Sequence, residues 1–508
     1  MTDHSLKSPS PDTSSQRSSQ AKFPSISDSI FCRLSLEYHF APVLCLSYLS
    51  PPATIPPDGN GPVPPSSPLP PLLLSGSEDG TLCLWVISLP NPKCVHSLSI
   101  PRNDDGGDIK DAEVTACALS WDVSLDQLCL HAASASKMYE YRLPSSVAFE
   151  GSVVTSISNP PSSSTTTAVA SDLSLELGCG DEINQLVVSK RAVAAADDTG
   201  CVRMLVRNQL RDGNNVRRKI FTHCSEALCT SIAWCNRTYP PLPSSTVYNR
   251  RRLYGGRSVS PTVLFLSGGT DSSVALWNVD RPWAALDRIE FNVDAEGNQM
   301  CNPPFIHALS WEPELGIAAS GCGDGTVRIL QVRENEGEVS KGSKGKGKKK
   351  GRISGHSGEK CRTKLKQVAM AYHGETETAC ACVSFIDTLI SKKKTMDETA
   401  LDMGKKDADW DNSDTKQQLL VSAGNDAHLC LWKVSLENKN TQKHERHSKG
   451  RGNGIGLERL HRICHGSKPN WVVGGAIASE KIEMRGPTYR NAFFVADCTS
   501  NEISVYYF

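Results

Sequence analysis

Histidine and aspartate recur along this chain in an order that could support acid–base chemistry. His39, His223 and His373 each precede an apolar run, and further along an aspartate stands in a polar turn. A histidine beside a carboxylate is a common general acid–base pair in enzymes. However, this order of histidine, apolar run and turn aspartate occurs three times, and one active site is not built several times in one chain. The repetition therefore favours structural hydrogen bonds over catalysis.

The sequence lacks the common motifs of nucleotide, ester and peptide-bond chemistry. It has no Walker loop, no Gly-x-Ser-x-Gly elbow and no His-Glu-x-x-His pair. The stretch Gly321–Gly325, GCGDG, could cradle a phosphate, but similar turn chemistry recurs elsewhere in the chain, which favours a β-turn. We therefore expect a protein that is not an enzyme and that needs no cofactor.

The cysteine pattern argues against a metal site. The chain has 19 cysteines, most of them inside apolar runs, and no Cys-x-x-Cys pair. Cys380 and Cys382 are alternate residues of one run, and Cys224, Cys229 and Cys235 do not have zinc-ligand spacing. Reduced, buried thiols are typical of cytosolic and nuclear proteins, so we expect the cytoplasm, the nucleus or both.

The elements that position these residues repeat. The stretch Leu72–Val86 consists of an apolar run, a turn containing aspartate and a second apolar run, which predicts two strands joined by a tight turn. Close copies of it lie at Leu264–Val279, Ile317–Val332 and Leu419–Val434, and a weaker copy lies at Val193–Val206. Self-similarity of this kind indicates a repeat architecture.

The repeats resemble those of the WD-repeat family of β-propellers. In that family a histidine, a strand serine or threonine, a turn aspartate and a tryptophan form a buried hydrogen-bond network in a blade. The resemblance implies three such sets, together with Asp324 as the turn aspartate of a fourth copy. The sets are His39, Ser75, Asp79 and Trp85; His223, Ser267, Asp271 and Trp277; and His373, Ser422, Asp426 and Trp432.

We therefore expect an all-β, seven-bladed propeller over residues 29–508, with a ring closed by an N-terminal strand at Ser29–His39. Blade two is expected to be degenerate, because it lacks both the turn aspartate and the closing tryptophan. Residues 1–28 are expected to be a disordered Ser-rich tail rather than a signal peptide. Disordered inserts are expected at 50–71, 145–171, 236–261, 333–362, 391–415 and 438–456.

The bulk charge points to no particular class of partner. The 55 Lys and Arg residues balance the 55 Asp and Glu residues, and no apolar run approaches membrane-spanning length. We expect neither a membrane nor nucleic acid as the main partner. The Lys-rich tract Lys341–Arg352 is the local exception, and it leaves open a second reading as a nuclear or nucleic-acid-associated scaffold acting through basic inserts.

Three segments narrow the resemblance within the family: Glu182–Leu205, Ser267–Ala284, and His465–Gly474 together with Val495–Phe508. This closer resemblance implies a protein-interaction scaffold, a monomeric propeller within a complex, that serves as a substrate receptor of a cullin–RING ubiquitin ligase. Such receptors dock onto the ligase's damage-binding adaptor and often carry Trp-Asp-x-Arg at the end of a third strand. The chain departs from that motif, and only Arg333 keeps the arginine position, which makes Arg333 the candidate partner-binding residue.

Overall fold

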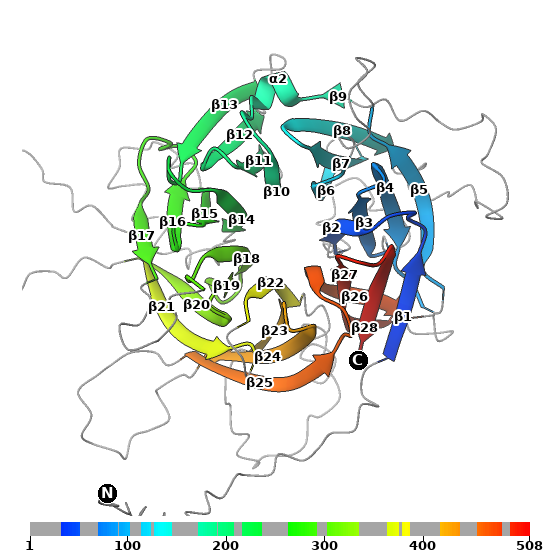
Figure 1. The fold of residues 1–508 in the computed structure, drawn as a ribbon. Coiled ribbons are helices and arrows are strands. Elements are labelled where there is room, and N and C mark those ends of the chain that lie inside the picture. The colour runs from blue at the N-terminus through cyan, green and yellow to red at the C-terminus, as the bar shows by residue number, and fades with distance from the viewer. Residues whose placement is uncertain are drawn as a thin grey trace, which may run out of the picture.

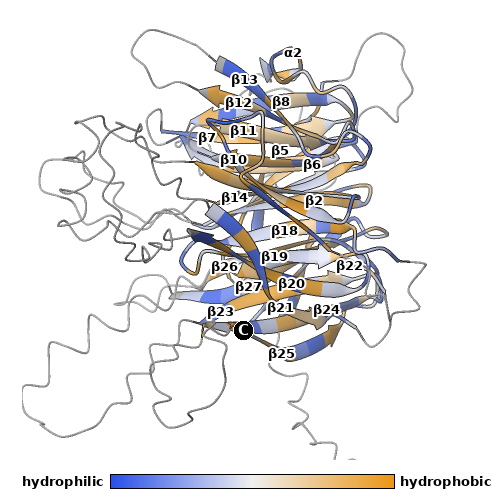
Figure 2. Cartoon of the chain, turned by 90° about the vertical axis from the view of Figure 1, so that its left-hand side faces the viewer, coloured by the Kyte–Doolittle hydropathy of each residue, from blue (hydrophilic) through white to orange (hydrophobic). Residues whose placement is uncertain are grey.

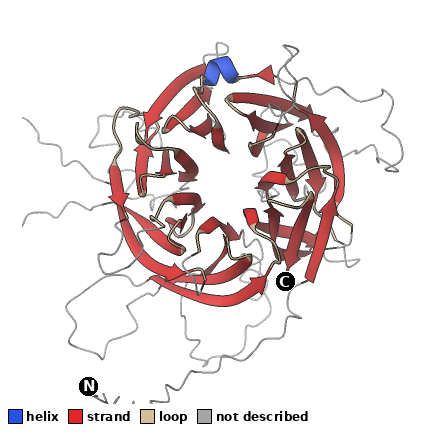
Figure 3. Ribbon diagram, in the orientation of Figure 1, coloured by secondary structure: helices blue, strands red, loops and turns tan. Residues whose placement is uncertain are grey.

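The computed structural model describes residues 32–50, 70–89, 91–101, 113–122, 126–144, 171–189, 192–207, 216–235, 263–291, 302–334, 363–374, 378–386, 417–436, 455–479 and 488–508. These residues form seven antiparallel sheets of four strands each, arranged as blades around a central axis (Figure 1). The described residues place strands in every blade and form a single short helix, α2 (Ser174–Leu177) (Figure 3). The predicted fold class, an all-β seven-bladed propeller, is confirmed.

The strands follow one another from the inside of each blade to the outside. Blade one holds β2 (Val43–Leu49), β3 (Leu72–Ser77), β4 (Thr81–Val86) and β5 (Lys93–Ser99). Blade two holds β6 (Ala116–Asp122), β7 (Gln127–Ser134), β8 (Lys137–Pro144) and β9 (Ser171–Asp172), and α2 (Ser174–Leu177) follows it. Blade three holds β10 (Ile183–Ser189), β11 (Ala192–Asp197), β12 (Cys201–Arg207) and β13 (Val216–Thr222).

The remaining blades repeat this plan. Blade four holds β14 (Cys229–Cys235), β15 (Leu264–Gly269), β16 (Ser273–Asn278) and β17 (Asp287–Glu290). Blade five holds β18 (Ile306–Glu312), β19 (Ile317–Cys322), β20 (Thr326–Glu334) and β21 (Thr363–Tyr372). Blade six holds β22 (Cys380–Ile386), β23 (Gln417–Gly424), β24 (His428–Leu436) and β25 (Ile455–Cys464). Blade seven holds β26 (Pro469–Ser479), β27 (Thr488–Asp497), β28 (Glu502–Tyr507) and β1 (Cys32–Glu37).

The ring closes where the N-terminal strand meets the C-terminal one, as the sequence predicts. Strand β1 pairs antiparallel with β28, in a register that runs from Cys32 opposite Tyr507 to Glu37 opposite Glu502. Figure 1 shows the blue β1 beside the red β28. A sheet edge that would otherwise stay unpaired is thereby covered within the chain.

The hydrophobic core lies between the blades. Each core cluster draws its side chains from two neighbouring blades; Leu74 and Leu84 of blade one, for example, pack with Leu128 and Leu130 of blade two. A single four-stranded sheet cannot bury both of its faces, so each blade depends on its two neighbours. In Figure 2 the outermost strand β25 carries a hydrophilic stretch, because an outer strand buries little.

Three fourth strands, β9, β21 and β25, lie where the sequence predicted none. β21 and β25 each bury one side chain, Leu365 and Ile455 respectively, so neither run shows the apolar alternation of a strand. β20 reaches two residues into the insert expected at 333–362, because its last residues pair with the start of β21. The expected tail at 1–28 and most of the six expected inserts lie outside the described residues.

The connections between strands sort onto two faces of the disc. One face carries the turns from each second strand to its third and the links from one blade to the next; we name it the turn face. The other carries the links from first to second and from third to fourth strands, and all six expected inserts fall in such links; we name it the insert face. The repeated histidines and aspartates therefore lie on the face opposite the one to which the inserts attach.

Candidate functional site

In blade four the four residues of the expected set lie together. His223 Nδ1 is 2.8 Å from Ser267 Oγ, and the Trp277 indole N–H donates to the same oxygen at 2.8 Å. His223 Nε2 lies 3.1 Å from Asp271 Oδ1. His223 follows the last strand of blade three, so the network joins two blades.

Blade six repeats this geometry closely. His373 Nδ1 and Trp432 Nε1 each lie 2.7 Å from Ser422 Oγ, and His373 Nε2 lies 3.4 Å from Asp426 Oδ1. Gly424 provides the space for the ring, because a Cβ atom at that position would lie 2.5 Å from the ring carbon Cδ2 of His373. The last residue of the second strand is therefore a glycine for a steric reason.

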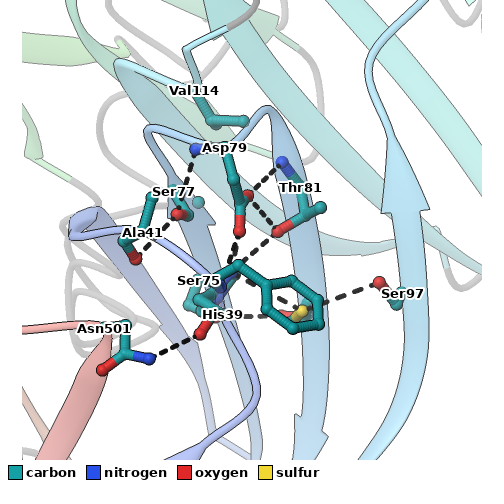
Figure 4. Close-up of polar contacts among 12 residues, drawn as sticks. His39, Ala41, Ser75, Ser77, Asp79, Thr81, Ser97, Val114 and Asn501 are labelled. Carbon is teal, nitrogen blue, oxygen red and sulfur yellow. Dashed lines mark hydrogen bonds and ion pairs between the residues drawn. The ribbon is translucent and has the colours of Figure 1, made fainter.

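Blade one uses an additional residue. His39 Nε2 lies 2.7 Å from Ser75 Oγ, which also accepts the Trp85 N–H at 2.9 Å. His39 and Asp79 are 4.0 Å apart, and Thr81 bridges them: its hydroxyl lies 2.8 Å from His39 Nδ1 and donates to Asp79 Oδ1 at 2.5 Å (Figure 4). The carboxylate thus acts on this histidine through a hydroxyl.

These networks are arranged for packing rather than for turnover. Ser75, Ser267 and Ser422 are all 0% exposed, and each hydroxyl oxygen is already held by a histidine and a tryptophan. A serine that no substrate can reach is not a working nucleophile. The networks instead link neighbouring blades through satisfied buried polar groups.

Blades three and five satisfy the aspartate with arginine instead of histidine. Arg328 Nη2 lies 2.5 Å from Asp324 Oδ2, and Arg203 Nε lies 2.5 Å from Asp197 Oδ2. The repeat pattern predicts Asp324 as a network residue, but it does not predict Asp197 or either arginine. A signal was present, since each arginine stands three residues after the turn glycine, Gly200 or Gly325. The position of the tryptophan in the set is taken by a leucine in blade five, Leu330.

Blade seven has a network that the repeat pattern does not predict. His465 Nδ1 lies 2.8 Å from the Tyr506 hydroxyl, and His465 Nε2 lies 3.6 Å from Asp497 Oδ2. Ser467 Oγ donates to the same carboxylate at 2.7 Å. Tyrosine here makes the contact that serine makes in blades one, four and six, so the serine-to-tryptophan spacing does not identify this network.

Blade two carries a buried acid–base pair in place of the repeated set. His131 Nε2 lies 2.9 Å from Glu140 Oε2 across the β7–β8 ladder, and Arg142 Nε lies 2.5 Å from Glu140 Oε1. His131 and Glu140 are 1% and 2% exposed. The blade that is degenerate in sequence therefore holds its own charged cluster, built from other positions.

The electrostatics agree with the geometry. Burial would raise the pKa of Asp271, but hydrogen bonds and charge interaction with His223, helped by Ser273, hold that pKa below its ordinary value. The contact with His373 is the largest cause of the lowered pKa of Asp426. Burial opposes protonation of His373, yet Asp426 and Cys430 outweigh burial and raise the pKa of His373 to about 9. His373 and Asp426 are thus an ion pair at neutral pH.

Arg333 lies away from these networks, near the end of β20 on the insert face. It is partly exposed, and its Nε donates to Gln331 Oε1 at 2.6 Å. In the strand register Arg333 stands opposite Lys364, and Gln331 stands opposite Lys366. Both lysines are exposed, so three cations share this corner of blade five. We name Arg333, Lys364 and Lys366 the blade-five cation group.

Within the described ranges, no cluster of three or more His, Cys, Asp or Glu side chains is arranged to hold a metal ion. No helix among the described residues has the length and apolar character needed to span a membrane.

Comparisons with known proteins give one family match and several similar solved structures. A family model described as "WD domain, G-beta repeat" matches residues 31–86, the stretch that contains the blade-one network. A comparison with curated proteins finds no match. Among solved structures, the chain is similar to Saccharomyces cerevisiae Sqt1, with 12% identity, a TM-score of 0.46, and coverage of 93% of this chain and 98% of that one.

A second similar structure is the β-propeller domain of Cps50 (Swd1) from Myceliophteria thermophila, with 9% identity and a TM-score of 0.47. That match covers 93% of this chain and 98% of the other. The seven blades make the chain a β-propeller, and within it residues 31–86 match a WD-repeat family model.

Proposed function

We propose that this chain is a protein-interaction scaffold and that it serves as a substrate receptor of a cullin–RING ubiquitin ligase, docked through the ligase's adaptor. WD-repeat propellers generally bind other proteins, and a rigid ring of blades holds surface loops in fixed relative positions. The buried networks occupy the polar residues that could otherwise suggest catalysis. The function therefore lies on the surface.

The specific assignment is supported by resemblance to WD repeat-containing protein 53. The segments of this chain that carry the resemblance most specifically are His465–Gly474 and Val495–Phe508. Both lie in or beside blade seven. There the Ser467 hydroxyl binds Asp497, and His465 binds Tyr506. These residues bind other residues of the same blade, so the two segments support a similar fold. The contact with another protein must therefore come from exposed residues elsewhere.

The blade-five cation group is the structural observation that supports the receptor function. Arg333 faces Lys364 across the β20–β21 ladder, and like charges directly opposite each other repel. A carboxylate from a partner would relieve that repulsion, and arginine can bind it with two parallel hydrogen bonds. A partner surface rich in aspartate and glutamate would have the complementary charge.

A partner search tests this proposal. The full chain, expressed with an affinity tag in cells, should recover the adaptor and the cullin as its most enriched partners by mass spectrometry. Recovery of other protein complexes without either component would refute the receptor assignment and leave the scaffold assignment in place.

A second candidate is a nuclear scaffold that binds nucleic acid, and the same cation group favours it. The Lys-rich tract Lys341–Arg352 lies in the link between β20 and β21, beside Arg333 and Lys364 in sequence. Basic side chains concentrated at one corner would bind a phosphate backbone without sequence preference. For either candidate we propose that the protein works in the cytoplasm, the nucleus or both.

A further inference from the structure

The strand that closes the ring is held differently from the outer strands of the other six blades. Among the described strands, β1 is joined to the ring at one end only, by the link to β2, whereas every other outer strand lies between two strands of the ring in chain order. We propose that β1 is exchangeable, and that the edge of β28 that it covers is a docking site for an extended segment of another protein. This edge belongs to blade seven, so the inference does not depend on the receptor function proposed for the blade-five cation group.

Strand β1 buries little of its own surface. Leu36 is 4% exposed and Leu34 is partly buried, whereas Arg33, Ser35 and Glu37 are exposed. Side-chain hydrogen bonds from Arg33 and Ser35 reach β28 at 2.9 and 2.6 Å, but both start from exposed side chains that water can solvate. The backbone ladder with β28 is therefore the main contact that holds β1, and a strand of this kind opens locally more easily than one buried on both faces.

Blades seven and one are also joined through their inner strands. The Tyr48 hydroxyl on β2 donates to Ala476 O at 3.0 Å and accepts the Ala476 N–H at 2.9 Å. The Tyr48 ring stacks on Phe494, with 5.7 Å between the ring centroids. On the insert face, the Leu89 N–H donates to Ala478 O at 2.7 Å. These contacts of β2, β26 and β27 keep the two blades together when β1 leaves.

The link that follows β1 fixes where such an opening ends. His39 Nε2 lies 2.7 Å from Ser75 Oγ in the blade-one network, and Asn501 Nδ2 donates to His39 O at 2.8 Å (Figure 4). His39 is thus held by blade one through its side chain and by blade seven through its backbone. The chain up to Glu37 can leave β28 while this network stays intact.

An uncovered β28 would need another strand beside it. It runs from Glu502 to Tyr507, and four of its six side chains are buried. Unpaired backbone groups along such an edge are a template for pairing with another chain. Addition of an extended segment to a sheet edge is also a recurring mode of peptide recognition. Strand β1 therefore protects an edge that a segment of another protein can occupy.

The residues of β1 show which chemistry fits this edge. Leu34 and Leu36 stand two residues apart, so they share one face of the strand, and both pack on the hydrophobic cluster between blades seven and one. On the opposite face, the Arg33 guanidinium lies over the Tyr506 ring, 5.7 Å from its centroid. A partner segment should therefore carry apolar residues at positions i and i+2, with a cation directly before the first of them.

Hydrogen exchange of the parent full-length protein, followed by mass spectrometry, tests whether β1 opens alone. The amides of β1 should exchange at least about tenfold faster than those of β2 and β26, because its local opening leaves the ring closed. Amides of β1 that exchange at the same rate as those of β2 and β26 would overturn the proposal, since β1 would then leave only when the ring opens.

The probe for the docking site is a fluorescein-labelled synthetic peptide with the sequence of residues 29–38 and with Cys32→Ser. Full-length Leu36→Asp should bind it at least about tenfold more tightly than the parent does, because the substitution frees the edge and raises the fraction of protein that is competent to bind. Leu365→Asp is the matched control: Leu365 is 8% exposed on the outer strand β21, and this variant should bind the peptide no better than the parent. Fluorescence anisotropy measures the affinities.

Equal affinities of the parent and the Leu36→Asp variant would overturn the proposal. Circular dichroism of Leu36→Asp should match that of the parent, and a loss of the β signal would also overturn it, because closure of the ring would then require β1. Light scattering identifies the remaining occupant, a second copy of the chain. A parent dimer that Leu36→Asp converts to a monomer would place β1 of one copy on β28 of the next and overturn the choice of another protein.

Discussion

Arg328 and Asp324 form a closed ion pair within blade five, with 2.5 Å between Nη2 and Oδ2 and with both side chains less than one-tenth exposed. Four other blades bring a histidine from the preceding blade to the corresponding carboxylate. The turn region of a blade thus contains a carboxylate that needs a positive or hydrogen-bonding partner, and the chain supplies that partner from different strands. This explains why the blades tolerate divergent sequences.

Replacing Arg328 with Met should destabilise the protein by about 3–5 kcal/mol, because the buried Asp324 carboxylate would lose its cation. Urea denaturation followed by circular dichroism measures the change. Arg217→Met, at an exposed position on β13, should change the stability by less than about 0.5 kcal/mol. Equal effects of the two substitutions would contradict the role assigned to Arg328.

Asp271→Ala should lower the unfolding free energy by about 1–3 kcal/mol, because His223 and Ser273 would lose a buried hydrogen-bond acceptor. Asp280→Ala is the matched control, since the Asp280 side chain is 69% exposed. Denaturation curves that coincide for Asp271→Ala and the parent would show that the network does not stabilise blade four.

Stability should depend on pH through His373. Its folded pKa of about 9 lies above the ordinary value of 6.5, so its protonated form is favoured by folding. The resulting stability is fully present below pH 6.5 and is lost as the pH rises through 9, a total of about 3 kcal/mol. Urea denaturation at several pH values measures this slope.

His373→Gln should flatten that part of the pH profile, while His96→Gln, at a partly buried position on β5, should leave the slope as it is in the parent. A parent protein whose stability does not fall between pH 6.5 and pH 9.5 would show that His373 is not protonated in the fold.

The sequence predicts the parts of this molecule that are buried on both sides. The runs around Ser75, Ser267 and Ser422 repeat because each must fit between two blades, and their spacing is visible without a structure. The outer strands β21 and β25 escape detection because each buries only one side chain, which leaves no apolar alternation in the sequence. The resemblance does not predict Arg203, Arg328 and His465. It implies one set of residues for the network, histidine with serine, aspartate and tryptophan. The chain also pairs the aspartate with arginine in two blades, and in blade seven it uses tyrosine in place of serine.

Deleting Lys341–Arg352 should leave the denaturation curve unchanged, because the tract contains no apolar residue that could join the core. If it binds nucleic acid, the deletion should abolish binding that is sequence-independent and falls steeply with salt. Fluorescence anisotropy with a labelled random duplex at 50 and 200 mM salt, roughly the range over which such contacts weaken, measures this effect. A deletion variant that binds and localises like the parent would make the tract a solubilising loop.

Direct binding of the purified full-length protein to the purified ligase adaptor tests the proposed function most directly. Binding should be saturable. Arg333→Ala should weaken it by about tenfold, the loss of one charge-assisted contact, and Arg217→Ala should leave it unchanged. Binding that both variants retain in full would contradict the assignment of Arg333 alone. An adaptor that does not bind the parent protein at all would contradict the receptor function.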